Sequence, residues 1–291
     1  MAFKITKNTI NNSKNVYFIG EVGINHNGDI DIAKKIILEA KKAGFSAVKF
    51  QKRNPEISTP ENIKSKLRET PWGEMTYLDY KFKIEFDKNE YDQIDKYCRE
   101  LEIDWFASCW DIDSLNFILK YQPPVLKLAS ASITNKELLI AHRDSGLPII
   151  MSTGMSTTEE IQKAHKVLQD NDLAILHTTS TYPCPPEELN LNVIKTLAQQ
   201  YPDIPIGYSG HESGLSTSIA AAVLGAKIIE RHITINRAMW GTDQAASLEP
   251  IGMQRLVGSV NKIITALGDG QKKVYESEMP IKEKLRNIDT L

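Results

Sequence analysis

Short apolar runs alternate with longer amphipathic segments along most of the chain. Eight of these runs are rich in β-branched residues and mostly apolar on both faces, which is typical of parallel strands covered by helices. The segments between them repeat apolar residues at helical spacing. The predicted strands are VYFIG (16–20), SAVKF (46–50), IDWFA (103–107), VLKLA (125–129), PIIMS (148–152), LAILH (173–177), IPIGY (204–208) and AKIIER (226–231).

Two of the intervening segments have clear helix ends. Residues 29–44 place apolar residues at helical spacing and close on a glycine. Residues 157–170 open with a threonine capping signal and an acidic first turn. Strands that each precede a helix form either an open doubly wound sheet or a closed barrel. Eight regular units favour closure, so the sequence predicts one α/β domain, residues 1–291, folded as a (β/α)8 TIM barrel.

One connection is abnormally long. Residues 52–86 separate the second predicted strand from the next clear helix, and they contain Arg68, Trp72, Tyr77 and Tyr80. A connection of this length is usually functional or independently packed. We therefore expect these side chains either to contact a sugar at the barrel mouth or to pin the segment to the barrel.

Composition narrows the class of protein. The 291 residues are 41% hydrophobic and 25% charged, with a net charge of -2, which is ordinary for a globular protein and gives no basic field for nucleic acid. The three cysteines show no C-x-x-C spacing. The polar N-terminal stretch is not a signal peptide, no run has the length of a membrane span, and residues 268–291 are polar and expected at the surface. These features predict a cytoplasmic protein without membrane or nucleic-acid partners.

Polar and ionisable residues stand at or just after the end of every predicted strand. In a barrel of this type the active site lies at the carboxyl ends of the strands, so these side chains should converge on one rim. Grouped by strand, they are Glu21, Asn25 and His26; Lys49 and Gln51; Ser108 and Cys109; Lys127 and Ser130; Ser152 and Thr153; His177, Thr179, Ser180 and Tyr182; Ser209 and His211; and Glu230, Arg231 and His232.

Two lysines interrupt otherwise apolar strands. Lys49 and Lys127 would be costly to bury without a partner. Facing one mouth together with Ser130, Ser152 and Ser209, they predict an anion site suited to phosphate and carboxylate. The alternative is that each lysine pairs with a structural carboxylate.

Two histidines end neighbouring strands. His211 and His232 could share one divalent cation and leave positions open for substrate and water, the alternative being histidines that are simply hydrogen-bonded. We expect His26 and His177 to be structural polar residues, and His142 to lie on a helix surface.

A carboxylate and a thiol also stand at strand ends. Glu21 precedes a glycine-rich turn and suits an acid/base role or a bond to a substrate hydroxyl, with helix capping or a salt bridge to Lys49 as the alternative. Cys109 could act as a nucleophile or metal ligand, but the sequence favours a small, half-buried thiol.

Taken together, these residues resemble the sialic acid synthase family, also called the N-acetylneuraminate synthase family. NHNGD, VKFQ, STGM and ERHIT occur in this order and are highly specific as a set. The matching segments span roughly residues 16–250 and are GEVGINHNGDIDIAKKIILEAKKAGFSAVKFQ, LKLASASITN, PIIMSTGM, LHTTSTYPCP, IGYSGH, ERHIT and WGTDQAASLEP.

The resemblance implies a synthase that condenses phosphoenolpyruvate with a sugar aldehyde, N-acetylmannosamine-like or a related aldose. The product would be a 2-keto-3-deoxy sugar acid, and phosphate would be released. It also implies a divalent metal, manganese or magnesium, and leaves a homodimer open. The expected site has Glu21, Lys49, Lys127 and Asp243 as catalytic residues, Gln51, Ser108, Ser130, Ser152, Ser180, Tyr182 and Ser209 as substrate ligands, and His211 and His232 as metal ligands.

Three features depart from the family pattern. Ser180 stands where members commonly have asparagine, which alters one expected phosphoenolpyruvate contact. Cys109, Trp110 and Asp111 stand where many members have Thr-Pro, which reshapes one wall. The C-terminal antifreeze-like domain, which supplies an arginine for the sugar in full-length synthases, is not expected in these 291 residues. The identity of the sugar therefore stays open.

Two alternative functions remain at this point. One is a 3-deoxy-octulosonate-8-phosphate-type synthase, whose phosphorylated sugar would need a second anion site, with Arg53, Arg68 and Arg237 as candidates. The other is a barrel that binds a sugar without catalysis. The presence of the full set of ionisable groups speaks against the second alternative, because such groups are costly to keep buried.

Overall fold

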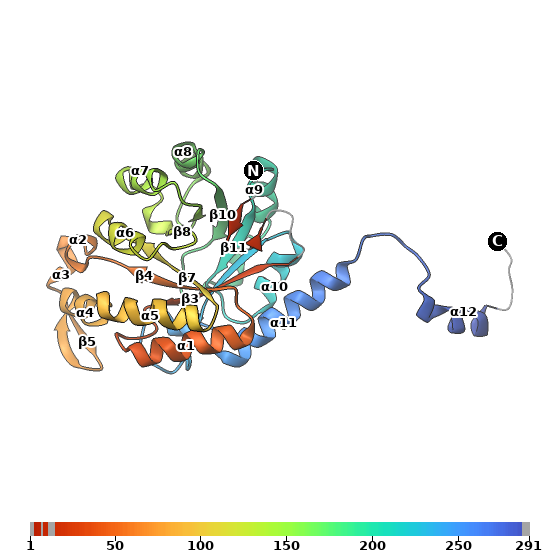
Figure 1. The fold of residues 1–291 in the computed structure, drawn as a ribbon, viewed down its shortest axis with the longest axis horizontal. Helices are drawn as coiled ribbons and strands as arrows, with labels where there is room; N and C mark the ends of the chain where they lie inside the picture. The colour runs from red at the N-terminus through yellow and green to blue at the C-terminus, as the bar shows by residue number, and fades with distance from the viewer. Residues whose placement is uncertain (1–2, 7, 11–14, 287–291) are drawn as a thin grey trace.

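Eight parallel strands close into a barrel in a computed structural model that describes residues 3–6, 8–10 and 15–286 (Figure 1). Neighbouring strands along the chain pair with each other, and the last pairs with the first. The predicted TIM barrel is therefore confirmed. Its strands are β3 (Tyr17–Gly23), β4 (Ala47–Lys52), β7 (Asp104–Cys109), β8 (Leu126–Leu128), β9 (Ile149–Ser152), β10 (Leu173–Thr178), β11 (Ile206–Gly210) and β12 (Ile228–His232).

Each barrel strand is followed by a helix that covers the outside of the barrel. The larger hydrophobic core lies between these helices and the strands. The helices are α1 (Ile30–Ala43), α5 (Lys88–Glu100), α6 (Ile112–Leu119), α7 (Lys136–Asp144), α8 (Thr158–Leu168), α9 (Val193–Gln200), α10 (Ser216–Val223) and α11 (Pro250–Leu267).

The two helices with predicted ends begin where their sequences indicate, and α1 also ends at its predicted glycine, whereas α8 ends at Leu168, two residues before the predicted end. Asp29 caps α1 by accepting from two backbone N–H groups of the first turn, and Gly44 ends it in the left-handed conformation, with φ of 87°. Thr157 and Glu160 form a reciprocal capping box at the start of α8. Local side-chain chemistry therefore fixes the start of both helices.

The barrel interior is apolar at one end and polar at the other. Because side chains alternate along a strand, every second residue points inward. Interior residues near the amino ends form a separate buried cluster that is closed from below by the hairpin of β1 (Lys4–Ile5) and β2 (Asn8–Thr9). The strands thus build an apolar floor beneath the polar rim. Members of the floor are Phe3, Ile5, Ile10, Tyr17, Ile19, Ala47, Phe106, Val125, Ile150, Ala174, Leu176 and Ile228.

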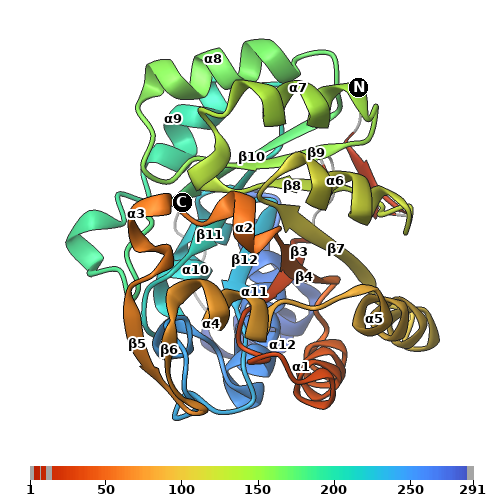
Figure 2. The same ribbon diagram turned by 90° about the vertical axis from the view of Figure 1, so that its left-hand side faces the viewer.

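The long connection after β4 is a packed unit of its own. Figure 2 looks onto the end of the barrel where this unit lies. Its elements are α2 (Pro55–Ser58), α3 (Glu61–Lys64), the hairpin of β5 (Leu67–Thr70) and β6 (Gly73–Thr76), and α4 (Tyr77–Ile84).

The polar C-terminal segment does not lie along the barrel. After α11 it continues through the short 3-10 helix Glu276–Glu278 to α12 (Met279–Leu285), is exposed throughout, and extends away from the barrel in Figure 1. Within the described ranges, no helix is long and apolar enough to cross a membrane.

Gly207 tests how tightly the barrel interior is packed. A Cβ added there would lie 2.6 Å from the carbonyl oxygen of Ile228 and would also collide with the Leu176 side chain. We expect Gly207→Ala to lower the free energy of unfolding by about 1–3 kcal/mol, measured by urea titration.

Gly258→Ala is the matched control, because an added Cβ on this exposed face of α11 meets nothing within 4 Å. It should raise stability by about 0.5–1 kcal/mol through helix propensity. Equal stability of the two variants would contradict the packing argument.

Candidate active site

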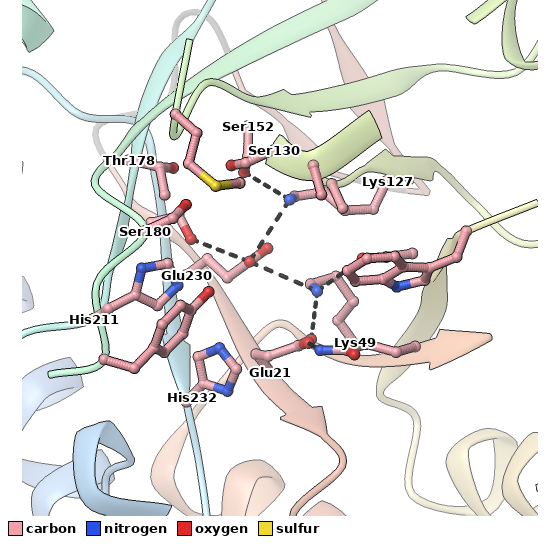
Figure 3. A pocket seen from close by; sticks show the side chains of 18 residues that line it. Glu21, Lys49, Lys127, Ser130, Ser152, Thr178, Ser180, His211, Glu230 and His232 are labelled. Carbon is pink, nitrogen blue, oxygen red and sulfur yellow. Dashed lines mark hydrogen bonds and ion pairs between the residues drawn. The ribbon is translucent and has the colours of Figure 1, made fainter. Parts of the chain in front are cut away.

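A cavity of about 230 Å³ opens at the carboxyl ends of the strands (Figure 3). All eight strands contribute at least one side chain to its wall. The loops beyond the strands add Trp110, Ser130, Ser180 and Tyr182. The cavity therefore lies where the sequence predicts convergence of polar groups.

Lys49 and Glu21 form a buried ion pair in the cavity wall. The Lys49 Nζ lies 2.5 Å from Glu21 Oε2 and donates to the Ser108 hydroxyl at 3.0 Å. The other carboxylate oxygen of Glu21 accepts from the Gln51 amide at 2.8 Å. Both charged side chains are almost fully buried. The alternative considered for Lys49, a pair with a carboxylate, is thus realised inside the cavity itself.

Glu230 links the two lysines. Its Oε1 lies 3.7 Å from the Nζ of Lys49 and 3.7 Å from that of Lys127, and it accepts from the Ser209 hydroxyl at 3.2 Å. Lys127 also donates to the Ser152 hydroxyl at 2.6 Å. Two ammonium groups and two carboxylates, with Glu21 as the second, therefore form one buried cluster (Figure 3).

The charged groups of the cluster differ in how readily they hold a proton. Burial raises the pKa of Glu21 above its ordinary value, although Lys49 opposes this. Burial acts on Glu230 in the same direction, but Lys127 and Lys49 outweigh it and hold the pKa of Glu230 below its ordinary value. Burial lowers the pKa of Lys127 to about 8, only partly offset by Glu230. Glu21 is therefore the carboxyl best able to hold a proton, and Lys127 the ammonium most easily lost.

Two hydroxyls meet over a glycine at the opposite wall. The Gly154 N–H donates to the Ser130 hydroxyl at 2.9 Å. A Cβ on Gly154 would collide with the Ser180 hydroxyl and lie 2.9 Å from that of Ser130. Both hydroxyls also line the cavity. The absence of a side chain at Gly154 thus brings two hydrogen-bond donors together in a wall suited to an anion.

The two predicted metal-binding histidines face one another across the rim. Their ring centroids lie 5.4 Å apart, and the ring of Tyr182 lies 4.0 Å from that of His211. The Nδ1 of His211 lies 2.7 Å from the Thr179 carbonyl oxygen, which can only accept, so this nitrogen holds the proton and Nε2 keeps its lone pair. Burial lowers the pKa of His211 to about 4, so the ring is neutral at physiological pH.

His232 has an unused ring nitrogen. Its Nδ1 is buried without a hydrogen-bond partner and lies 3.6 Å from Asp243 Oδ2. Neutral imidazoles with available lone pairs suit a divalent cation that leaves positions open for substrate. In the described part of the chain, however, no set of three or more histidine, cysteine, aspartate or glutamate side chains is arranged to hold a metal ion. The two histidines therefore fit an open site but not a closed cage.

Most of the predicted site residues lie together. Asp243 is the exception, because it stands beside His232 at the edge rather than in the cavity wall. The geometry assigns no role by itself, so the individual roles stay predictions. The residues that line the cavity as expected are Glu21, Lys49, Gln51, Ser108, Lys127, Ser130, Ser152, Ser180, Tyr182, Ser209, His211 and His232.

Six wall residues had no predicted role, namely Glu230, Thr178, Trp110, Ala129, Ala131 and Met155. Glu230 was expected only to reach the rim, Trp110 was expected only to reshape one wall, and Thr178 was given no place in the site. The signal for Glu230 was present in the sequence, because residues two apart on a strand face the same side and Glu230 precedes His232 by two. Trp110 lies in a loop, where no such periodicity exists.

Other expectations have mixed outcomes. His26 is structural as predicted: its Nδ1 accepts from the Gly28 N–H at 3.0 Å and its ring stacks on Phe86. The surface position predicted for His142 is wrong, since this side chain is fully buried on the inner face of α7. Cys109 is fully buried, and burial raises the pKa of its thiol, so it is an inert core residue.

The aromatic residues of the long connection pack against one another. Trp72 and Tyr80 contact the ring of Trp240, and the Arg68 guanidinium lies over Tyr80 at 4.1 Å. None of Arg68, Trp72, Tyr77 and Tyr80 lines the cavity. This supports the expectation that they pin the segment to the barrel.

Comparison with known proteins places these features in a family. The sequence profile of the NeuB family matches residues 36–272. The chain is 37% identical to the N-acetylneuraminate-9-phosphate synthase of Mus musculus over 92% of this chain and 76% of the relative. It is 32% identical to the N,N'-diacetyllegionaminic acid synthase of Legionella pneumophila over 96% of this chain and 81% of the relative.

A solved structure shares the whole architecture. The crystal structure of an N-acetylneuraminic acid synthetase from Leptospira borgpetersenii, in complex with citrate, superposes with a TM-score of 0.85 at 32% identity. The match covers 99% of this chain and 98% of that one.

Direct metal titration tests the two histidines. We expect His232→Ala to weaken Mn²⁺ binding by about 10-fold or more, because one of two protein ligands is lost. Calorimetry on the metal-stripped protein measures this without reference to activity. His165→Ala is the control, since His165 stacks on Tyr201 away from the cavity. Unchanged affinity in a folded His232→Ala protein would contradict the assignment.

Proposed function

The chain belongs to the NeuB family of phosphoenolpyruvate-condensing synthases, and we propose that its acceptor is an N-acetylmannosamine-like aldose in the open-chain aldehyde form. The products are a 2-keto-3-deoxy sugar acid and phosphate. Membership of this enzyme family, with the ionisable set intact, speaks against a barrel that only binds sugar. It also favours a nonulosonic acid synthase over an octulosonate-type enzyme.

The buried cluster of two lysines and two glutamates is the observation that best supports this proposal. Phosphoenolpyruvate offers a phosphate and a carboxylate, and Lys49 and Lys127 each supply an ammonium group to the same cavity. Ser130, Ser152 and Ser180 add hydroxyl donors around it. Charge-assisted hydrogen bonds of this kind both bind and orient an anion.

The chemistry joins two reactants held in one cavity. The C3 of phosphoenolpyruvate attacks the aldehyde carbon, and positive charge develops at C2. Water adds at C2, and the resulting tetrahedral centre loses phosphate together with the former bridging oxygen. The ionised Glu230 lowers the energy of positive charge nearby, while Glu21, whose pKa is raised by burial, holds or moves a proton at the new hydroxyl. Much of the rate enhancement comes from holding both reactants in place.

A divalent cation fits the acceptor side of the cavity. His211 and His232 would hold it, and when bound it polarises the aldehyde oxygen as a Lewis acid. Tyr182 and Asp243 stand beside these histidines, where they exclude water and accept hydrogen bonds from sugar hydroxyls.

Isotopic labelling tests the proposed bond cleavage. Phosphoenolpyruvate carrying ¹⁸O in its C2–O–P bridge is turned over with N-acetylmannosamine, and the label is located by mass spectrometry. We expect the label in the released phosphate, because water attacks C2 and the C–O bond breaks. Label retained in the keto acid would mean P–O cleavage and would contradict the mechanism.

The depressed pKa of Lys127 predicts an alkaline limit to substrate capture. The ammonium is charged below about pH 8 and neutral above it, so the attraction for phosphoenolpyruvate is lost as pH rises through that value. We expect kcat/KM for phosphoenolpyruvate to fall about tenfold per pH unit beyond this point, because this parameter reports the free enzyme.

The matched variants are Lys127→Met, which should lose this alkaline limb along with most activity, and Lys120→Met, which changes an exposed lysine and should keep it. A wild-type profile that stays flat to pH 9.5 would refute the role of Lys127.

A further inference from the structure

Arg53 is a buried cation next to the cavity that the proposed reaction does not use. It directly follows β4, is only 7% exposed, and donates through Nη2 to the side-chain oxygen of Gln51. Its guanidinium lies over the ring of Trp110, 4.3 Å from the centroid. Gln51 and Trp110 both line the cavity. Arg53 therefore stands immediately behind one end of the cavity wall.

Two buried donors at this place have no acceptor. The Nε of Arg53 and the Nε1 of Trp110 are both buried without a hydrogen-bond partner among the described residues. Leaving such groups unpaired costs stability, most of all when the donor is charged. An acidic or phosphorylated group arriving here would meet donors already oriented and already stripped of water.

Further cations lie around Arg53. Arg68 and Lys81 both lie over the ring of Tyr80, at 4.1 Å and 5.5 Å. In the described part of the chain, no carboxylate lies within 4 Å of the charged nitrogens of these three side chains, although the Arg53 backbone N–H donates to the Glu85 carboxylate at 3.1 Å. Burial, then the nearby Arg53 charge, lowers the pKa of Lys81 to about 8. The region thus holds three cations, whose positive charge Asp243 and Glu85 partly offset.

The spacing suits the far end of a sugar. Gln51 bridges Glu21 and Arg53, with its amide donating to Glu21 at 2.8 Å. The path from the Glu21 carboxylate to the Arg53 guanidinium crosses one hydrogen bond, the Gln51 amide group and a second hydrogen bond. The two charged groups therefore lie at most about 8 Å apart. An extended six-carbon chain spans about 6 Å, and a phosphate on its last carbon reaches about 2–3 Å further.

We propose that Arg53, with Lys81 and Arg68 beside it, forms a second anion subsite for a phosphate monoester at the end of the acceptor sugar farthest from its aldehyde. The inference rests on the proposed function, since that function places the aldehyde near Glu21. The planar guanidinium can offer two parallel N–H groups to phosphate oxygens, whereas Gln51 keeps contact with the sugar hydroxyls. The enzyme would then act on a phosphorylated aldose.

A purely positioning role for Arg53 makes a different prediction. If Arg53 served only to orient Gln51 toward Glu21, its loss would weaken all acceptors alike. If it binds phosphate, its loss weakens only phosphorylated acceptors. Paired ligands that differ by the phosphate alone separate the two roles.

Calorimetric titration with unreactive acceptor analogues provides the test. N-acetylmannosaminitol 6-phosphate and N-acetylmannosaminitol lack the aldehyde, so they bind without turnover. We expect the wild-type protein to bind the phosphorylated alcohol at least about 10-fold more tightly, and Arg53→Gln to weaken that ligand by about 10- to 100-fold. The unphosphorylated alcohol and phosphoenolpyruvate should change less than about threefold, because neither reaches the guanidinium.

Arg143→Gln is the matched control, since Arg143 is exposed on α7 and pairs with its neighbour Asp144. It should leave the affinities for all three ligands unchanged. Three results would each overturn the subsite. They are equal weakening of both alcohols in Arg53→Gln, a preference for the phosphorylated alcohol that survives in that variant, and no such preference in the wild type. Failure of the wild type to bind phosphoenolpyruvate would instead contradict the proposed function, and the phosphate preference would still be measured.

Discussion

Charge balance inside the barrel is the constraint on which the rest of the site depends. Lys49, Lys127, Glu21 and Glu230 are each at most 5% exposed, and a buried charge without a partner is strongly destabilising. As a set they are close to neutral, which makes their burial tolerable. The set is also poised, because Lys127 is charged below about pH 8 and the raised pKa of Glu21 favours uptake of a proton by that carboxylate when an anion enters. The same balance that permits folding therefore allows the cavity to accept a multiply charged ligand.

Strand periodicity explains how the sequence assembles this cluster. Ile19 and Ala47 belong to the apolar floor, and two residues further along their strands stand Glu21 and Lys49. A step of two residues along each strand thus changes the inward-facing side chain from apolar to charged, and this pattern can be seen in the sequence. The fold, most of the cavity wall and the two capped helices could be predicted for the same reason: each depends on spacing within one short segment. The role of Glu230 could not be predicted, because its partners Lys49, Lys127 and Ser209 stand on three other strands.

Features that depend on distant contacts could not be predicted. The four-residue helices and the hairpin between β4 and α5 have little stability of their own, and Arg68 reaches Trp240 across the barrel mouth to hold them. His142 has a helical pattern that does not reveal which face packs inward. Arg53 lies one residue beyond β4, yet only the folded structure shows that its guanidinium has no carboxylate partner among the described residues and stands behind Gln51. The proposed phosphate subsite around Arg53 therefore depends on tertiary contacts, whereas the cluster of two lysines and two glutamates follows from strand periodicity.

The inward and outward faces of β12 make different contributions to the site. Glu230 and His232 point into the barrel, whereas Arg231 between them points outward and is fully buried. Its guanidinium donates to the Glu212 carboxylate at 3.0 Å, to the Glu212 carbonyl at 2.6 Å and to the Gly214 carbonyl at 2.9 Å. Glu212 directly follows His211, so this outer ion pair ties the loop that bears one histidine to the strand that bears the other. The proposed cation site between the two histidines would need such rigidity, because the ring positions must be set before the ligand arrives. The geometry of the inner face is in this way stabilised by hydrogen bonds that lie outside the cavity.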